Sequence, residues 1–255
     1  MRVSQQLAYV LHHYSYRETS VLLELFTRNH GRLGVLAKGA RRSGPRQRAP
    51  IEPFQPLLVD WSGRGELPVL AAVELDGDPV FLNGVRLYCG FYMNELLLRL
   101  LHRHDPHESL FMAYRASLAV LTADGPVEST LRVFEKRLLQ EVGYGLVLDQ
   151  EITDNRPIDP EGVYEYVVDR GPVQVTDSAS GRPGRGIRVS GSSLLALADE
   201  TLVDPLALRE TKALMRGALA RHLGGKPLNS RKLFRNVKQP PVDENQETGA
   251  DEARR

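Results

Sequence analysis

The apolar positions in the first eighty residues fall into short segments typical of β-strands. Five such segments are rich in Val, Leu and aromatic residues: 7–11, 20–26, 33–38, 56–61 and 68–75. Turn-forming residues separate them, among them Gly31 and the Ser-Gly-Arg-Gly-Glu sequence at 62–66. Closely spaced strands joined by one long loop at 39–50 predict a small β-barrel, a class that includes the OB-fold.

The apolar repeat becomes helical beyond residue 82. Three segments, 83–103, 108–122 and 128–142, carry apolar residues three or four positions apart. Pro126 lies near the first turn of the third segment, where proline is tolerated, and Gly143 follows its end. Three amphipathic helices predict a helical domain packed beside the barrel.

The chain from 149 to 188 is rich in Gly, Pro, Asp and Ser, with brief strand-like pieces at 163–168 and 173–175. Helical signals resume at 192–198 and 204–223, where Asp204 is the expected N-cap and Pro205 the first helical residue. The chain beyond residue 240 is polar and acidic, a composition typical of disorder.

These elements predict an α+β protein whose domains follow from the changes in pattern. The expected units are an OB-fold barrel at 1–80, a helical domain at 81–147 and 190–238, a small β or loop insertion at 148–189, and a disordered acidic tail at 239–255.

The formal net charge of +1 hides a strong segregation of charge. Between Glu24 and Glu52 there are seven Lys or Arg residues and no carboxylate, and 211–242 holds eight more, again without an acid. These fifteen of the 33 Lys and Arg residues leave 18 to face all 32 Asp and Glu elsewhere. Basic segments on an otherwise acidic protein indicate a polyanion-binding face, and nucleic acid is the first candidate.

The candidate DNA-binding residues are cations of these two segments. They are Arg32, Lys38, Arg41, Arg42, Arg46 and Arg48 in the first segment, and Lys226, Arg231, Lys232 and Arg235 in the second. The alternative for the first is a merely solvated loop. The alternative for the second is a terminal helix packed through Leu228, Leu233 and Phe234, with its charges facing water. Trp61 is expected in the barrel core rather than as a base-stacking platform.

The third predicted helix carries a further basic group. Arg132 and Lys136 are four residues apart and so share a face, with Arg137 beside them. Such a face can clamp a peptide that ends in apolar residues and a carboxylate. The alternative is ordinary salt bridging to Glu128 and Glu135.

Candidate catalytic chemistry is sparse. The single cysteine, Cys89, excludes an internal disulfide and a multi-cysteine zinc site, and its apolar surroundings indicate a small buried hydrophobe in a cytosolic protein. A metal-dependent nuclease using His102, His104 and Asp105 is one hypothesis, but Pro106 interrupts whatever element they share. No nucleophile motif or phosphate loop occurs, and no apolar run is long enough to span a membrane. We therefore expect a non-enzyme with no cofactor, no metal and no membrane partner, located in the cytoplasm with the nucleoid.

Several motifs resemble the RecO family of bacterial DNA repair proteins. They are the sequences at 16–20, 26–27, 31–34, 37–42, 53–56, 63–66, 90–97, 131–135, 143–145, 224–228 and 230–235. The resemblance runs from near the N-terminus to about Arg235. It implies an N-terminal OB-fold, a helical domain and a small module that often holds a four-cysteine zinc site. That module has no cysteine here, so we expect it to be zinc-free.

The resemblance also implies partners. It predicts binding of single- and double-stranded DNA, annealing of complementary strands, and action with RecR to load RecA onto DNA coated by single-stranded-DNA-binding protein (SSB). The acidic C-terminal tail of SSB is then the expected peptide for Arg132, Lys136 and Arg137. The alternative is a protein-interaction adaptor that binds acidic peptides and contacts DNA only indirectly.

Overall fold

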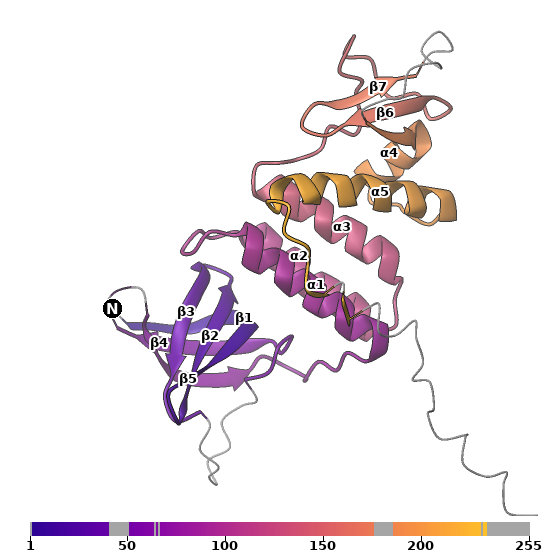
Figure 1. The fold of residues 1–255 in the computed structure, drawn as a ribbon. Helices are drawn as coiled ribbons and strands as arrows, with labels where there is room; N and C mark the ends of the chain where they lie inside the picture. The colour runs from indigo at the N-terminus through magenta and orange to yellow at the C-terminus, as the bar shows by residue number, and fades with distance from the viewer. Residues whose placement is uncertain are drawn as a thin grey trace, which may run out of the picture.

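The structure is a computed structural model that describes residues 2–40, 51–63, 65, 67–175, 186–230, 232 and 233. Within these residues, five strands close into a barrel in the order β1-β2-β3-β5-β4, with β4 pairing back to β1 (Figure 1). The strands are β1 Arg2–Tyr16, β2 Ser20–Thr27, β3 Gly31–Ala37, β4 Leu57–Ser62 and β5 Val69–Leu75. All pairs are antiparallel except β3 with β5. The predicted barrel is confirmed.

The first strand is much longer than the predicted 7–11. Register shifts between Val3 and Gln6 and between Val10 and His12 bend β1, so that its first half pairs with β4 and its second half with β2. Bulges of this kind increase local twist and help a sheet to close. The polar residues from His12 to Tyr16 hid the second half of this strand from the apolar pattern.

The barrel interior is filled by alternate residues of each strand. Its core consists of Val3, Ala8, Val10, Leu23, Leu25, Leu33, Val35, Ala37, Leu57, Val59 and Trp61. Trp61 is buried, which confirms its predicted place in the core, and the His30 ring packs edge-on against it. Because side chains alternate between faces, Tyr9 and Phe26 point out of the barrel instead.

The exterior of β1 and β2 is the surface on which the helices pack. The Tyr9 ring lies 5.5 Å from Phe111 and 5.1 Å from Tyr114, centroid to centroid, and Phe26 lies 5.4 Å from Phe111. The buried Asn94 donates to the carbonyls of Val10 and Leu11 at the β1 bulge, at 3.4 and 3.0 Å. Barrel and helices therefore share an apolar core and a buried polar link.

The helices follow the predicted order. They are α1 Gly84–Leu100, α2 Glu108–Thr122, α3 Val127–Glu141, α4 Gly191–Ala198 and α5 Pro205–His222. The Asp204 carboxylate accepts from the Ala207 amide at 2.8 Å, so the predicted N-cap of α5 is confirmed. The first predicted helix, 83–103, ends earlier, at Leu100. Beyond it the backbone of Arg103 bridges to Arg32, and the His104 amide donates to the Arg32 carbonyl at 2.9 Å.

A small antiparallel sheet lies at the opposite end of the helical stack from the barrel (Figure 1). Its order is β7-β6-β8, with β6 Val163–Val167, β7 Gly171–Gln174 and β8 Ile187–Ser190. The third strand lies at the end of the region expected to be a small β or loop insertion, at a position where no strand was predicted, and it runs directly into α4, whose N-cap is Ser190. Tyr164, Tyr166 and Val189 belong to the same apolar core as the helices. The insertion is thus joined to the helical domain by packing.

Candidate nucleic-acid interface

The outer face of β1, β2 and β3 continues beyond the helical contact as an exposed surface. The strand register places His12 opposite Glu24 and Glu24 opposite Gly34, and the next outward-facing row holds Tyr14, Leu22 and Leu36. The row after that begins with Tyr16 opposite Ser20. Because alternate residues share one face, His12, Tyr14 and Tyr16 form a line along β1. Tyr14 is 48% exposed and Tyr16 36%, so their rings are available for stacking.

An open groove of about 810 Å³ borders this face at the β1–β2 turn. It is lined by the turn residues 16–20 together with Leu36, Lys38 and Gly39. The Arg17 guanidinium lies 5.4 Å from the centre of the Tyr16 ring. Lys38 is exposed and marks the beginning of the acid-free loop. Aromatic rings beside cations are the combination that holds single-stranded nucleic acid, because bases stack while phosphates pair with charge.

The predicted residues of the first basic segment take different places. Lys38 lies on the groove. Arg32 faces the helical domain, where its Nη1 lies 3.8 Å from the Glu24 carboxylate and burial lowers its pKa despite that carboxylate. Arg32 is therefore mostly an internal charge. Arg41, Arg42, Arg46 and Arg48 lie outside the described residues.

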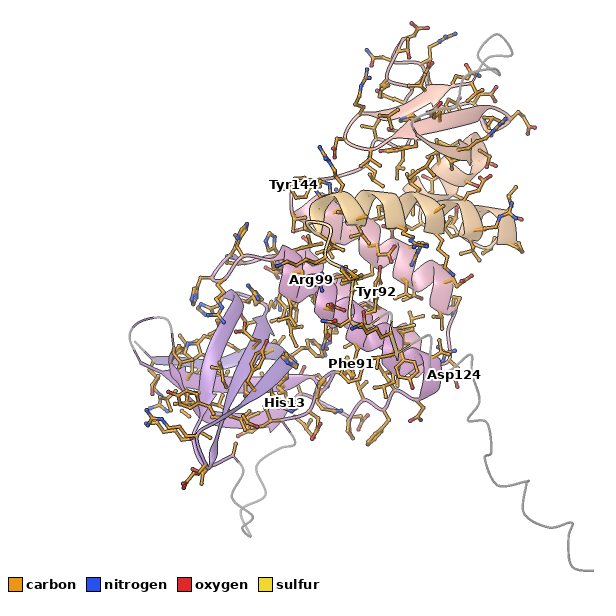
Figure 2. The ribbon with its side chains drawn as sticks, in the orientation of Figure 1. His13, Phe91, Tyr92, Arg99, Asp124 and Tyr144 are labelled. Carbon is orange, nitrogen blue, oxygen red and sulfur yellow. The ribbon has the colours of Figure 1, made fainter. Side chains whose placement is uncertain are left out.

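The second basic segment is tied to α1 by two side chains. The Glu95 carboxylate accepts from the Asn229 amide at 2.9 Å and from the Ser230 amide and hydroxyl at 2.8 and 2.7 Å. Arg99, labelled in Figure 2, donates to the carbonyls of 226 and 227 and to Glu95. Burial alone would raise the pKa of Glu95, but these hydrogen bonds and the Arg99 charge lower it below its ordinary value.

The second segment was interpreted either as a set of DNA-binding cations or as a terminal helix packed against the protein, and the structure has features of both. Leu228 is buried in the shared core, as the packing interpretation expects, whereas Leu233 is 36% exposed. Lys226 and Lys232 are exposed, so packing and cation display coexist. Arg231, Phe234 and Arg235 lie outside the described residues.

The basic group on α3 is paired within the protein. Arg132 is buried, and its Nη2 donates to Glu135 at 2.6 Å, which confirms one of the expected salt bridges. Lys136 and Arg137 both pair with Glu200 rather than with Glu128, whose partner is Lys212. Salt bridging, the alternative to peptide binding, is therefore present in the structure, with Glu200 in place of Glu128 as the partner of Lys136 and Arg137. Arg137, with 43% of its side chain exposed, is the most accessible of the three predicted cations.

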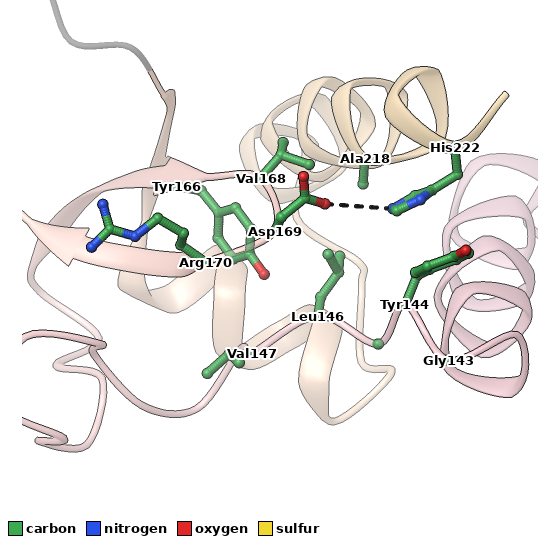
Figure 3. Close-up of a pocket in the computed structure, with 11 residues that line it drawn as sticks. Gly143, Tyr144, Leu146, Val147, Tyr166, Val168, Asp169, Arg170, Ala218 and His222 are labelled. Carbon is green, nitrogen blue, oxygen red and sulfur yellow. Dashed lines mark ion pairs between the residues drawn. The ribbon is translucent and has the colours of Figure 1, made fainter. Parts of the chain in front are cut away.

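A second cavity, of about 200 Å³, lies between the end of α3, the β6–β7 turn and the end of α5 (Figure 3). Tyr144 stacks on His222 with ring centroids 3.8 Å apart, and the His222 ring nitrogen lies 3.7 Å from Asp169. Arg221 also donates to Asp169, at 2.8 Å. These contacts join the small sheet to α5, and the Asp169 carboxylate already faces two basic side chains.

No group of three or more His, Cys, Asp or Glu residues is placed to hold a metal ion in the described part of the chain. His102, His104 and Asp105 are accordingly not gathered into the nuclease site hypothesised from sequence. Asp105 instead lies 3.4 Å from His107, whose other ring nitrogen is 3.5 Å from Glu141. Cys89 is buried, as predicted, and burial raises its thiol pKa to about 11. None of the described helices is long and apolar enough to cross a membrane.

Sequence reasoning missed the aromatic part of the interface. Tyr14, Tyr16 and Arg17 were not among its candidates, and neither was Arg103, which reaches Glu24 from the end of α1. A signal for the tyrosines was present, since aromatic side chains recur at alternate positions 12, 14 and 16 directly before Arg17. No local pattern pointed to Arg103, because its contact spans 79 residues.

Comparison with known proteins identifies the family. Residues 1–77 match the family model for the recombination protein O N terminal, and residues 82–232 match the model for its C terminal. The DNA repair protein RecO of Methylococcus capsulatus is 49% identical over 235 residues, which cover 92% of this chain and 94% of the relative. The RecO proteins of Nitrosospira multiformis and Aromatoleum aromaticum are 43% and 45% identical over 93% of this chain and 97% and 98% of their own lengths. The chain therefore belongs to the RecO family of DNA repair proteins, and its role lies in DNA repair and recombination.

Proposed function

We propose that this protein is a non-enzymatic recombination mediator that binds DNA. It binds single and double strands, anneals complementary strands and, with RecR, promotes loading of RecA onto SSB-coated DNA. The observation that carries the DNA-binding part is the exposed line of His12, Tyr14 and Tyr16 beside Arg17 and Lys38. Family membership supports the role in recombination.

The two kinds of DNA use this surface differently. Unpaired bases stack on exposed aromatic rings, at about 1–3 kcal/mol per base. A duplex keeps its bases stacked internally, so it is held mainly through its phosphates, by Lys38 and the other exposed cations. Holding strands by stacking and charge carries no sequence requirement, which suits a protein that must anneal any pair of complementary strands.

The tyrosines give the first test, by fluorescence anisotropy with a labelled thymidine oligonucleotide. Replacing both Tyr14 and Tyr16 by Ala removes two stacking platforms and should weaken single-strand binding by at least roughly 30-fold, with duplex binding nearly unchanged. The matched control is Tyr144→Ala, since Tyr144 is 49% exposed and lies far from the barrel, at the end of α3 (Figure 2). Unchanged single-strand affinity in the double variant would remove the platform from the mechanism.

Lys38 gives the second test, which concerns charge. If Lys38 neutralises one phosphate of the single strand, Lys38→Ala should reduce the slope of log affinity against log salt by about 0.7, whereas the tyrosine variant should keep the slope. Lys212→Ala is the control, because Lys212 is exposed and pairs with Glu128 on the helical domain. If the wild-type protein shows no saturable binding to bare DNA, the adaptor function remains and the DNA-binding proposal fails.

The SSB tail would meet a basic group in which Lys136 and Arg137 already pair with Glu200. We propose that the tail carboxylates displace Glu200 from Arg137, the exposed member of the group. Glu200→Gln should then tighten binding of an SSB tail peptide, and Arg137→Gln should weaken it. The opposite order of affinities would exclude this site.

The proposed action with RecR is tested by the rate at which RecA assembles on SSB-coated DNA. This rate should rise only when RecR and this protein are both present.

A further inference from the structure

We infer that the DNA path continues from the barrel across the domain boundary to Arg103, whose guanidinium binds a backbone phosphate. This inference rests on the proposed function, because it extends the path of the same single strand. Arg103 follows α1 and therefore belongs to the helical part of the chain. Its side chain nevertheless reaches back over the barrel, where Nη2 donates to the Glu24 carboxylate on β2.

The location of Arg103 is fixed by its backbone and by the strand beneath it. The backbones of Arg32 and Arg103 form a bridge, and the next amide, that of His104, donates to the Arg32 carbonyl. Gly34 lies under the guanidinium, and a Cβ atom added there would be 3.5 Å from Arg103 Nη2. That distance is an ordinary van der Waals contact, so the guanidinium lies directly against the outer face of β3 at Gly34.

Arg103 is continuous with the aromatic line. Glu24, its partner, is the cross-strand neighbour of His12, and the His12 ring packs edge-on against Tyr14 at 4.4 Å. From Gly34 to Lys38 the strand advances about 13 Å. Arg103 and Lys38 therefore mark two ends of one face, and Tyr14 and Tyr16 lie along β1 over the same length.

The charges at this end leave Arg103 in excess. Glu24 is buried, with 4% of its side chain exposed, and it faces two arginines. The exposed fraction of the side chain is 18% for Arg32 and 42% for Arg103. One guanidinium is enough to neutralise one carboxylate. The surplus positive charge lies on the more exposed group, whose remaining N–H donors have no hydrogen-bond partner among the described residues. A guanidinium held on one side and open on the other is suited to phosphate.

The test uses the full chain and a labelled thymidine oligonucleotide. Arg103→Gln should weaken binding roughly tenfold and lower the salt slope by about 0.7. Because that change also deprives buried Glu24 of a partner, the double variant Glu24→Gln with Arg103→Gln keeps the shape without the stranded carboxylate. It should show the same reduction of affinity and slope. Glu24→Gln alone should bind at least as tightly as wild type, since it removes a negative charge beneath the strand.

Arg156→Gln is the matched control. Arg156 is exposed and pairs with Glu151 and Asp154 in the region of the small sheet, so its replacement should change neither affinity nor slope. Wild-type affinity and slope in the folded double variant would overturn the inference. If the tyrosine variant still loses binding in that case, the proposed function stands and only Arg103 leaves the path. Absence of saturable binding by wild-type protein would overturn both.

Discussion

Glu95 holds the second basic segment on the helical domain, and its replacement by Gln tests this anchoring. The carboxylate accepts three hydrogen bonds from Asn229 and Ser230 and one from Arg99. A glutamine has one acceptor oxygen in place of two, so at least one segment donor would face an amide NH₂. The removal of one hydrogen bond to a charged group and the weakening of the others cost about 2–4 kcal/mol of local stability.

Amide hydrogen exchange measures this local stability directly. If exchange follows the equilibrium population of the open segment, the amides of Asn229 and Ser230 should exchange roughly 30- to 1,000-fold faster in Glu95→Gln. Amides in the middle of α2 should keep their rates, because the opening is local. Glu108→Gln is the control, since Glu108 pairs with Arg28 on the surface far along the chain from this segment.

One result would refute the reasoning about Glu95. It is unchanged exchange at Asn229 and Ser230 in a variant whose fold and global stability match wild type. In that case Leu228, which is buried in the core, would hold the segment without help from the carboxylate.

Three further predictions concern stability and reactivity. The Arg137 hydrogen bond lowers the folded-state pKa of Glu200, so its contribution is complete above about pH 4.5 and is lost as pH falls through the lowered pKa. Urea unfolding at acid pH should therefore show a smaller pH dependence in Glu200→Gln, and an unchanged dependence would contradict this. Phe26→Ala should lower the free energy of unfolding by about 3–5 kcal/mol. In this variant Trp61 fluorescence, which follows the barrel, and circular dichroism, which follows the helices, should show one common unfolding transition, and separate transitions would argue against a shared core. Cys89, with its pKa raised to about 11, should react with a thiol reagent at neutral pH only after unfolding, and rapid native-state reaction would contradict its burial.

Much of the fold was predictable because its elements carry local signals. The strands of the barrel interior, the helix at 108–122 and the cap at Asp204 all follow from apolar spacing and turn chemistry. The end of β1 was not predictable in this way, because exposed residues pair there by backbone contacts alone. The strand Ile187–Ser190 is defined by pairing with β6, and its own four residues hold too little pattern.

The candidate site was predictable only where charge density was the signal. Lys38 was found because acids are missing around it. The pairing of Arg137 with Glu200 and of Arg103 with Glu24 joins residues 63 and 79 positions apart, and no spacing rule reports such contacts. The exposure of the Tyr14 and Tyr16 rings could not be predicted either, since the sequence does not distinguish an exposed tyrosine that can stack on a base from one packed in the core.

The aromatic contact between barrel and helices bears on how this protein can be divided. The two family models meet between residues 77 and 82, yet Tyr9, Leu11, Phe26 and Phe54 of the barrel belong to the core of the second half. If the chain were cut at this boundary, the first fragment would expose these four large apolar side chains to water. The second fragment would expose the apolar surface against which they pack. The boundary between the two family models therefore divides the sequence but does not divide this shared core.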